Sequence, residues 1–80
     1  MLSQLASSAK VVGVKQSKKV IRDGSAKAVF IAADAERRIT GPIYELCEQQ
    51  NVEVTEVPSM KELGSAVGIA VGAAVVTILD

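Results

Sequence analysis

The sequence predicts an α/β fold in which a largely parallel or mixed sheet lies between layers of helices. Helical and strand-like hydrophobic patterns alternate along the chain, beginning with a helix and ending with a strand. Residues 28–33 form an uninterrupted apolar run of strand length, which is typical of a strand covered on both faces. Because 80 residues with 49% hydrophobic side chains suffice for one small core, we expect a single domain over residues 1–80.

The first half of the chain predicts two helices, each followed by a strand. Apolar residues recur at helical spacing near the amino terminus, where Ser3 suits the N-cap position of a helix. Gly24 suits the left-handed position just beyond the end of the second helix. The predicted elements are, in order, a helix over residues 2–9, a strand over 11–14, a helix over 15–23 and a strand over 28–33.

The second half repeats this alternation. Thr40 suits an N-cap, and Pro42 is tolerated in the first turn of the helix that would follow it. Ser59 and Glu62 form a capping-box pair at the start of the last helix. The predicted elements are a helix opened by Thr40, with Ile43, Leu46 and Cys47 buried and Asn51 at its end; a strand over 52–57 with one bulge or a shift near its end; a helix from Ser59 to about Gly68; and a strand over 73–79.

Residues 63–79 carry no charge, and Gly64, Gly68 and Gly72 are spaced four apart, as in packed membrane helices. The run only just reaches the length of a membrane span and has no basic or aromatic flank. The capping box and the β-branched residues near the end instead divide it into a helix, a turn and a strand. We therefore expect no membrane segment.

The composition argues against an enzyme and against a metal site. The chain has no histidine, so neither a serine nor Cys47 has the usual basic partner for nucleophilic catalysis. A single cysteine excludes an internal disulfide and, without histidine, argues against a zinc site. Cys47 fits the apolar stripe of its helix, and Asp34 and Glu36 fit an ordinary polar turn. We expect no cofactor, and cytoplasm as the compartment, since no secretory signal is visible.

Charge is distributed unevenly, although its sum is zero. Residues 1–27 carry six basic side chains and one acid, whereas the remainder carries three basic side chains and eight acids. Lys15, Lys18 and Lys19 fall where a helix is predicted to start, next to Gly13, although acids are preferred at that electropositive end. This pattern indicates an anion site, with phosphate the usual ligand. A solvated basic helix face is the alternative from these residues alone.

A base-stacking platform on the sheet is not indicated, because Phe30 lies in the buried run and Tyr44 in a helix. If nucleic acid binds, loops and helix ends must contact it. The residues then resemble one known family, the L7Ae and L30e ribosomal proteins that bind kink-turn RNA, and most closely its short bacterial members. The matching segments lie in family order over nearly the whole chain: residues 13–19 (Gly-Val-Lys-Gln-Ser-x-Lys), 31–36 (Ile-Ala-x-Asp-Ala-Glu), 46–48 (Leu-Cys-Glu) and 57–71, which contain Val-Pro-Ser and Leu-Gly-x-Ala-x-Gly-Ile.

The resemblance implies a three-layer α-β-α sandwich with a four-stranded mixed sheet. It also implies a non-enzymatic protein, expected to be a monomer, whose target is a bent RNA with a bulge beside tandem sheared G·A pairs. That RNA would belong to ribosomal RNA or a riboswitch, and the ribosome is a possible wider partner. The implied RNA-binding residues are Gly13, Val14, Lys15, Gln16 and Lys19 at the G·A pairs, Ile69, Ala70 and Val71 against a flipped base, and Glu36 near that base.

Two departures from the family pattern bear on this expectation. Lys15-Gln16 stands where archaeal and eukaryotic members usually have Asn-Glu, although short bacterial members share Lys-Gln. Since Gln16 accepts only through a neutral amide oxygen, we expect weaker discrimination of guanine, offset by the attraction of Lys15 for phosphate. Ala70 replaces a residue that is usually polar. A second hypothesis is an adaptor for protein interaction or ribosome assembly that uses the acidic part of the chain without contacting RNA.

Overall fold

The computed structural model describes residues 9–79, which contain four strands and three helices. Except for its last residue, the helix predicted over residues 2–9 lies outside this range. The described elements are β1 (Lys10–Val12), α2 (Val14–Arg22), β2 (Ala26–Ala32), α3 (Arg37–Gln50), β3 (Glu53–Val57), α4 (Met60–Ala66) and β4 (Val75–Leu79).

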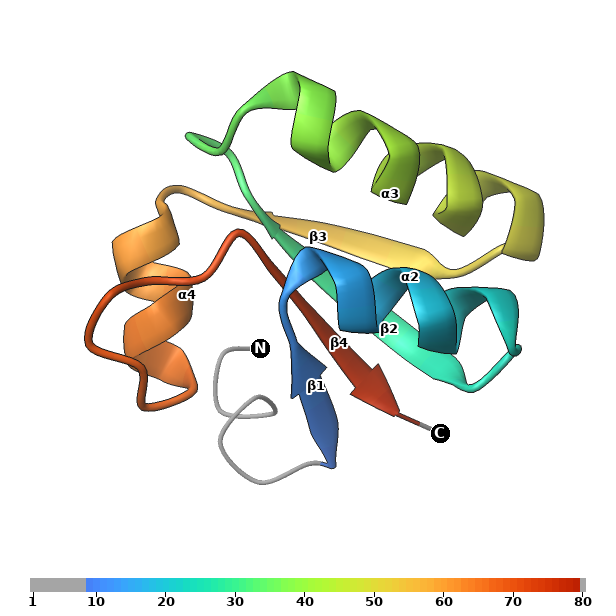
Figure 1. The fold of residues 1–80 in the computed structure, drawn as a ribbon, viewed down its shortest axis with the longest axis horizontal. Coiled ribbons are helices and arrows are strands. Elements are labelled where there is room, and N and C mark those ends of the chain that lie inside the picture. The colour runs from blue at the N-terminus through green and yellow to red at the C-terminus, as the bar shows by residue number, and fades with distance from the viewer. Residues whose placement is uncertain (1–8, 80) are drawn as a thin grey trace.

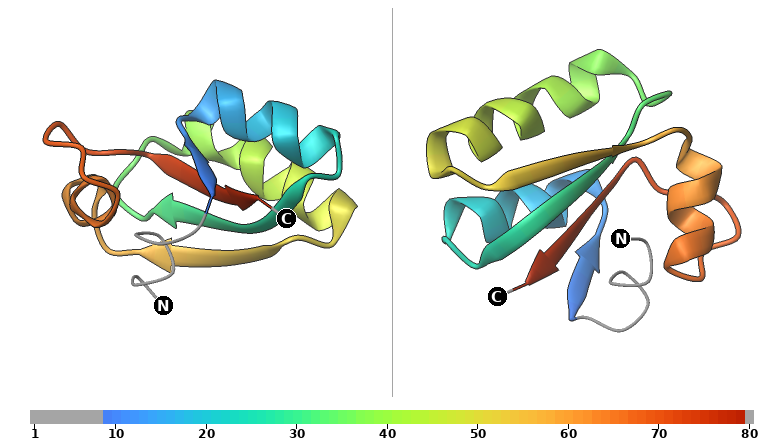
Figure 2. Two further views of the ribbon diagram at one scale, coloured as in Figure 1. Left: turned by 90° about the horizontal axis from the view of Figure 1, so that it is seen from below. Right: turned by 180° about the vertical axis from the view of Figure 1, so that it is seen from behind.

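The four strands form one mixed sheet in the order β1-β4-β2-β3. Strand β4 is antiparallel to both of its neighbours, β1 and β2, whereas β3 is parallel to β2. Helices α2 and α3 lie side by side over one face, and α4 lies on the other side of the sheet (Figures 1 and 2). The predicted α-β-α sandwich with a four-stranded mixed sheet is therefore confirmed.

The apolar run in β2 is continuous because both faces of this central strand are buried. Val29 and Ile31 join the core beneath α2 and α3, which also contains Ile43 of α3. Phe30, which points to the opposite face, joins a second core with Leu63 of α4. Alternate residues of a strand point to opposite faces, so an uninterrupted apolar sequence supplies both cores.

Helix α3 begins four residues earlier than predicted. Pro42 normally marks a helix start, yet here it lies inside a helix that begins at Arg37, with Glu36 as the N-cap residue. Thr40 is not the cap. It is buried in the helix, and its hydroxyl donates to the carbonyl oxygen of Glu36 at 3.4 Å. Asn51 ends the helix in the left-handed conformation, as predicted.

Several strand limits also differ from the prediction. Strand β3 pairs with β2 without a register shift, and the irregularity of the sheet lies between Ala26 and Ala28 of β2, opposite β4. Strand β1 ends at Val12 because Gly13 turns the chain at φ 112°. Strand β4 begins at Val75, since Ala73 still donates to the Met60 carbonyl oxygen of α4.

The uncharged segment over residues 63–79 is divided as predicted into the end of α4, a loop and strand β4. The capping-box serine is also confirmed, because the Ser59 hydroxyl accepts from the backbone N–H of Glu62 at 3.1 Å. In the part of the chain that the structure describes, no helix combines the length and the apolar character needed to span a membrane.

Thr77 gives a test of the packing between α2 and the sheet. Its side chain is fully buried, and its hydroxyl has no hydrogen-bond partner within residues 9–79. Burying an unpaired hydroxyl is unfavourable, so Thr77→Val is expected to raise the free energy of unfolding by about 1 kcal/mol. Chemical denaturation measures this change. Thr40→Val is the matched control, because it removes a hydroxyl that has a partner, and it should lower stability. Equal losses in the two variants would contradict the prediction.

Candidate nucleic-acid interface

The topology brings four loops to one edge of the sheet. Strands β1, β2 and β3 end there and β4 begins there, because β4 runs against both of its neighbours. We call this side of the molecule the loop edge; it consists of the chain at Gly13 and of residues 33–36, 58–59 and 67–74. Every residue predicted to contact RNA lies in one of these loops or in the helix that follows Gly13 (Figure 1).

Gly13 makes the corner between β1 and α2. Its N–H donates to the Val75 carbonyl oxygen at 2.8 Å, and its own carbonyl accepts from the N–H of Ser17 at 3.1 Å. A side chain at φ 112° would be strained, which accounts for glycine at this position. Helix α2 has no capping side chain and no acid in its first turn. Its first N–H groups thus remain without a side-chain acceptor at the loop edge.

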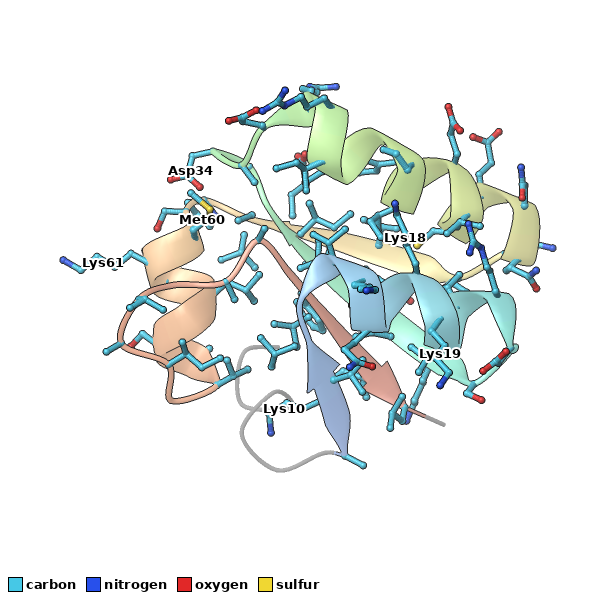
Figure 3. All side chains as sticks on the ribbon, viewed as in Figure 1. Lys10, Lys18, Lys19, Asp34, Met60 and Lys61 are labelled. Carbon is cyan, nitrogen blue, oxygen red and sulfur yellow. The ribbon has the colours of Figure 1, made fainter. Side chains whose placement is uncertain are left out.

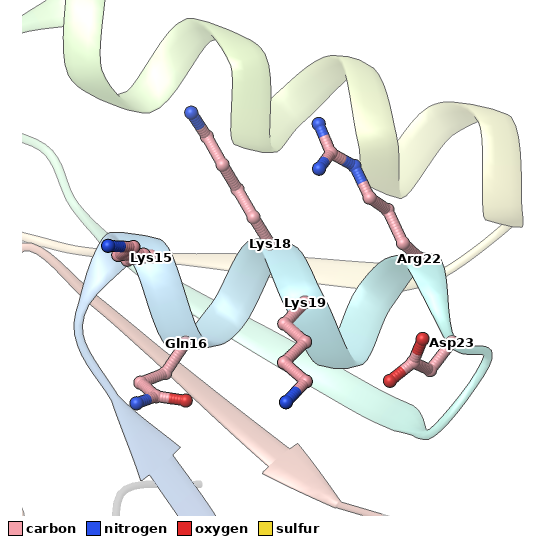
Figure 4. Close-up of a pocket in the computed structure, with 6 residues that line it drawn as sticks. All are labelled: Lys15, Gln16, Lys18, Lys19, Arg22 and Asp23. Atoms are coloured by element: carbon pink, nitrogen blue, oxygen red, sulfur yellow. The ribbon is translucent and has the colours of Figure 1, made fainter.

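The outer face of α2 is basic and polar. Lys15, Gln16 and Lys19 are exposed, whereas Ser17 and Ile21 face the protein interior. The lysine side chains have no hydrogen-bond or ion-pair partner within the described residues. Val14 was also predicted to contact RNA, but unlike these exposed residues it is half-buried against the core beneath α2 and α3. A shallow surface hollow of about 530 Å³ follows this face and is lined by Lys15, Gln16, Lys18, Lys19, Arg22 and Asp23 (Figure 4).

The loop between α4 and β4, residues 67–74, presents an apolar surface, and we call it the apolar loop. Val71 is 93% exposed, the highest value among the large hydrophobic residues that are exposed in the structure, and Ala70 is also exposed. Ile69 is half-buried. Val71 precedes Val75 by only four residues, so at most about 14 Å of chain separates the two. Val75 accepts the hydrogen bond from Gly13 at the start of α2. The structure thus brings the apolar loop and the start of α2 to the same edge.

The apolar loop is held against α4 by backbone contacts. The N–H of Ile69 donates to the Gly64 carbonyl oxygen at 2.7 Å, and Ala73 donates to that of Met60 at 3.0 Å. Gly64 packs directly on Gly72, where an added Cβ would lie 2.9 Å from the Gly72 nitrogen and carbonyl carbon. Gly64 and Gly72 therefore pack a helix against a loop, and not one membrane helix against another, whereas Gly68 has open space around its Cβ position.

Asp34 is a structural residue of the loop edge that sequence analysis missed. Its Oδ1 accepts from the backbone N–H of Met60 at 2.8 Å, which ties the β2–α3 loop to the first turn of α4 (Figure 3). The two residues are 26 positions apart, so no local pattern marks the contact. Glu36 is exposed at the same edge, and its Oε2 accepts from Nε of Arg38 at 2.7 Å.

Cys47 lies in the core, as predicted. It points from α3 into the core and is fully buried, and burial raises the pKa of its thiol to about 11. Such a thiol is protonated at neutral pH and is a poor nucleophile. No group of three or more acidic or cysteine side chains that could hold a metal ion occurs within residues 9–79.

Comparison with known proteins identifies the family. The model of the ribosomal protein L7Ae/L30e/S12e/Gadd45 family matches residues 2–80. An RNA-binding protein of Geobacillus sp. (strain WCH70) is 45% identical over 69 residues, and RNA-binding protein YbxF of Geobacillus stearothermophilus is 44% identical; each match covers 86% of this chain and 84% of the relative. The solved structure of a Giardia lamblia 15.5kD RNA binding protein superposes with a TM-score of 0.88 at 28% identity, covering 99% of this chain and 68% of that one. The chain belongs to the ribosomal protein L7Ae/L30e/S12e/Gadd45 family, as its sequence motifs indicated.

Proposed function

We propose that this chain is a non-enzymatic, ribosomal-protein-like RNA-binding protein that recognises kink-turns and stabilises their bent form, acting as a monomer in the cytoplasm. The observation that carries the proposal is the meeting, at the loop edge, of an unpaired basic helix start and an exposed apolar loop. RNA offers both kinds of partner, since its phosphates are anionic and its unstacked bases are apolar on their faces. Relatives that are named RNA-binding proteins support the same function.

Each part of the loop edge has a distinct role in this proposal. Gln16 and Lys19 contact base edges at the sheared G·A pairs, because amide and ammonium groups pair with base acceptors and donors. Lys15 contacts phosphate, and Gly13 lets the RNA approach the backbone closely. The apolar loop packs on the base extruded from the bulge, with Glu36 near it. Because the protein binds the bent form of the RNA more tightly than the straight form, binding shifts the RNA population toward the bent form.

A comparative titration tests the function. The chain is titrated against a kink-turn duplex and against the same duplex in which the G·A pairs are replaced by Watson–Crick pairs. Tighter binding to the first is expected, at one stated salt concentration, because phosphate contacts are common to both duplexes. Equal binding, or none, would contradict kink-turn recognition. Absence of binding to both would favour an adaptor that uses the acidic part of the chain.

Val71 tests the role of the apolar loop. Because its side chain is 93% exposed, Val71→Ser is expected to change the free energy of unfolding by less than about 0.5 kcal/mol. The same change should weaken binding to the kink-turn by about 1 kcal/mol, since the valine loses its contact with the extruded base. Denaturation and titration of one preparation measure both quantities. Unchanged affinity would remove the apolar loop from the interface.

A further inference from the structure

The exposed side chains of α2 form two rows on opposite sides of the helix. Gln16 and Lys19 extend to one side, and both were predicted to contact bases (Figure 4). Lys18 and Arg22 extend to the other side, toward α3. From the sequence, Lys18 was counted in a candidate anion site, but neither side chain was named as an RNA contact. Side chains three or four positions apart share one side of a helix, which accounts for both pairs.

The second row, Lys18 and Arg22, carries two positive charges that no acidic side chain of the described residues neutralises. Neither Lys18 nor Arg22 has a hydrogen-bond or ion-pair partner within residues 9–79, although Lys18 is half-buried. Helix α2 contains four basic residues and no acid. Basic residues three or four positions apart repel one another and disfavour the helix, and α2 contains several such pairs. An anionic partner along the helix would remove this repulsion.

We propose that Lys18 and Arg22 bind the phosphate backbone of an RNA stem next to the kink, while Gln16 and Lys19 contact its bases. The inference rests on the proposed function and extends the interface along α2 toward its carboxyl end. Lys18 and Arg22 are four residues apart, so this row is about 6 Å long, enough to face more than one phosphate of a strand. Phosphate contacts set orientation and affinity without reading sequence.

Salt dependence separates this role from base recognition. Lys18→Gln/Arg22→Gln is compared with Lys27→Gln/Arg37→Gln, which removes the same two types of charge outside α2. Glutamine keeps a good helix propensity, and thermal unfolding of each variant confirms that it is folded. For each protein, affinity for the kink-turn duplex and for its G·A-replaced form is measured at several salt concentrations.

The expected result has two parts. The slope of log K against log salt becomes shallower by about 1.5–2 in the Lys18/Arg22 variant and changes less in the control, since each lost phosphate contact removes close to one released counterion. The ratio of the two affinities stays within about twofold of the original, because both duplexes carry the same phosphates.

Either of two results would overturn the inference. A slope no shallower than that of the control would show that Lys18 and Arg22 do not reach phosphate. Loss of the affinity ratio in the folded variant would show that they read bases. Equal binding of both duplexes by the unmodified chain is a separate result, because it contradicts the proposed function, and this inference with it, before any variant is compared.

Discussion

Replacing Gly64 by alanine is expected to lower the free energy of unfolding by about 2–3 kcal/mol. The added methyl group would overlap the backbone of Gly72, with the Gly72 nitrogen and carbonyl carbon 2.9 Å away. Backbone cannot rotate aside as a side chain does, so either α4 or the apolar loop must move from the sheet. Urea denaturation measures the loss. Because Ile69 donates to the Gly64 carbonyl, the displacement should also reach the apolar loop.

Gly41→Ala is the matched control, because Gly41 is also helical but has open space around it. It lies in α3, and nothing lies within 4 Å of the position that its Cβ would occupy. Alanine has the higher helix propensity, but a Cβ on the residue before Pro42 disfavours the helical conformation, so stability should change by less than about 1 kcal/mol. The close packing of Gly64 on Gly72 would be refuted if the two variants were equally stable.

The lysine at position 19 is expected to make the largest contribution to RNA affinity. Lys19→Ala should weaken binding to a kink-turn duplex by about 1–3 kcal/mol, as expected for a side chain that reaches a base edge. Its affinity for the G·A-replaced duplex should fall less, so the preference for the kink-turn decreases. Titration of both duplexes by the variant gives the two values.

Lys27→Ala serves as the comparison for this change. Lys27 is an exposed lysine near the start of β2, at the end of the strand opposite the loop edge. Lys27→Ala removes one positive charge, as Lys19→Ala does, so an effect of net charge alone would appear in both variants. Equal affinities of Lys19→Ala and the unmodified chain would exclude contact between Lys19 and the RNA.

Most of the fold could be predicted because its signals are local. The buried run in β2, the capping serine at Ser59 and the terminating Asn51 each act through neighbours within a few residues. The start of α3 was wrong because Pro42 was interpreted as a helix start. The helix continues through it, with the Thr40 hydroxyl bonded to the carbonyl oxygen four residues earlier.

The sequence pointed to side chains of the candidate site but not to the contacts that hold its loops together. The basic start of α2 and the exposed Val71 were identified from the sequence, and the structure places both at the loop edge. Their role in binding RNA stays a prediction. Asp34 could not be recognised as a tie to α4, and neither could the packing of Gly64 on Gly72, because both contacts depend on how distant segments meet. Spacing along the chain does not encode them.

The hydrogen bonds between the loops have a consequence for binding affinity. Gly13 is bonded to β4, Asp34 to Met60, and Met60 to Ala73, so the surface is preorganised before any ligand arrives. A rigid protein surface loses little entropy on association, so the polynucleotide is the partner that must change its shape. The apparent dissociation constant of the complex then equals the intrinsic value divided by the fraction of nucleic-acid molecules that already have the binding-competent shape. Mutations in the nucleic acid that alter this fraction would change complex formation without touching the protein.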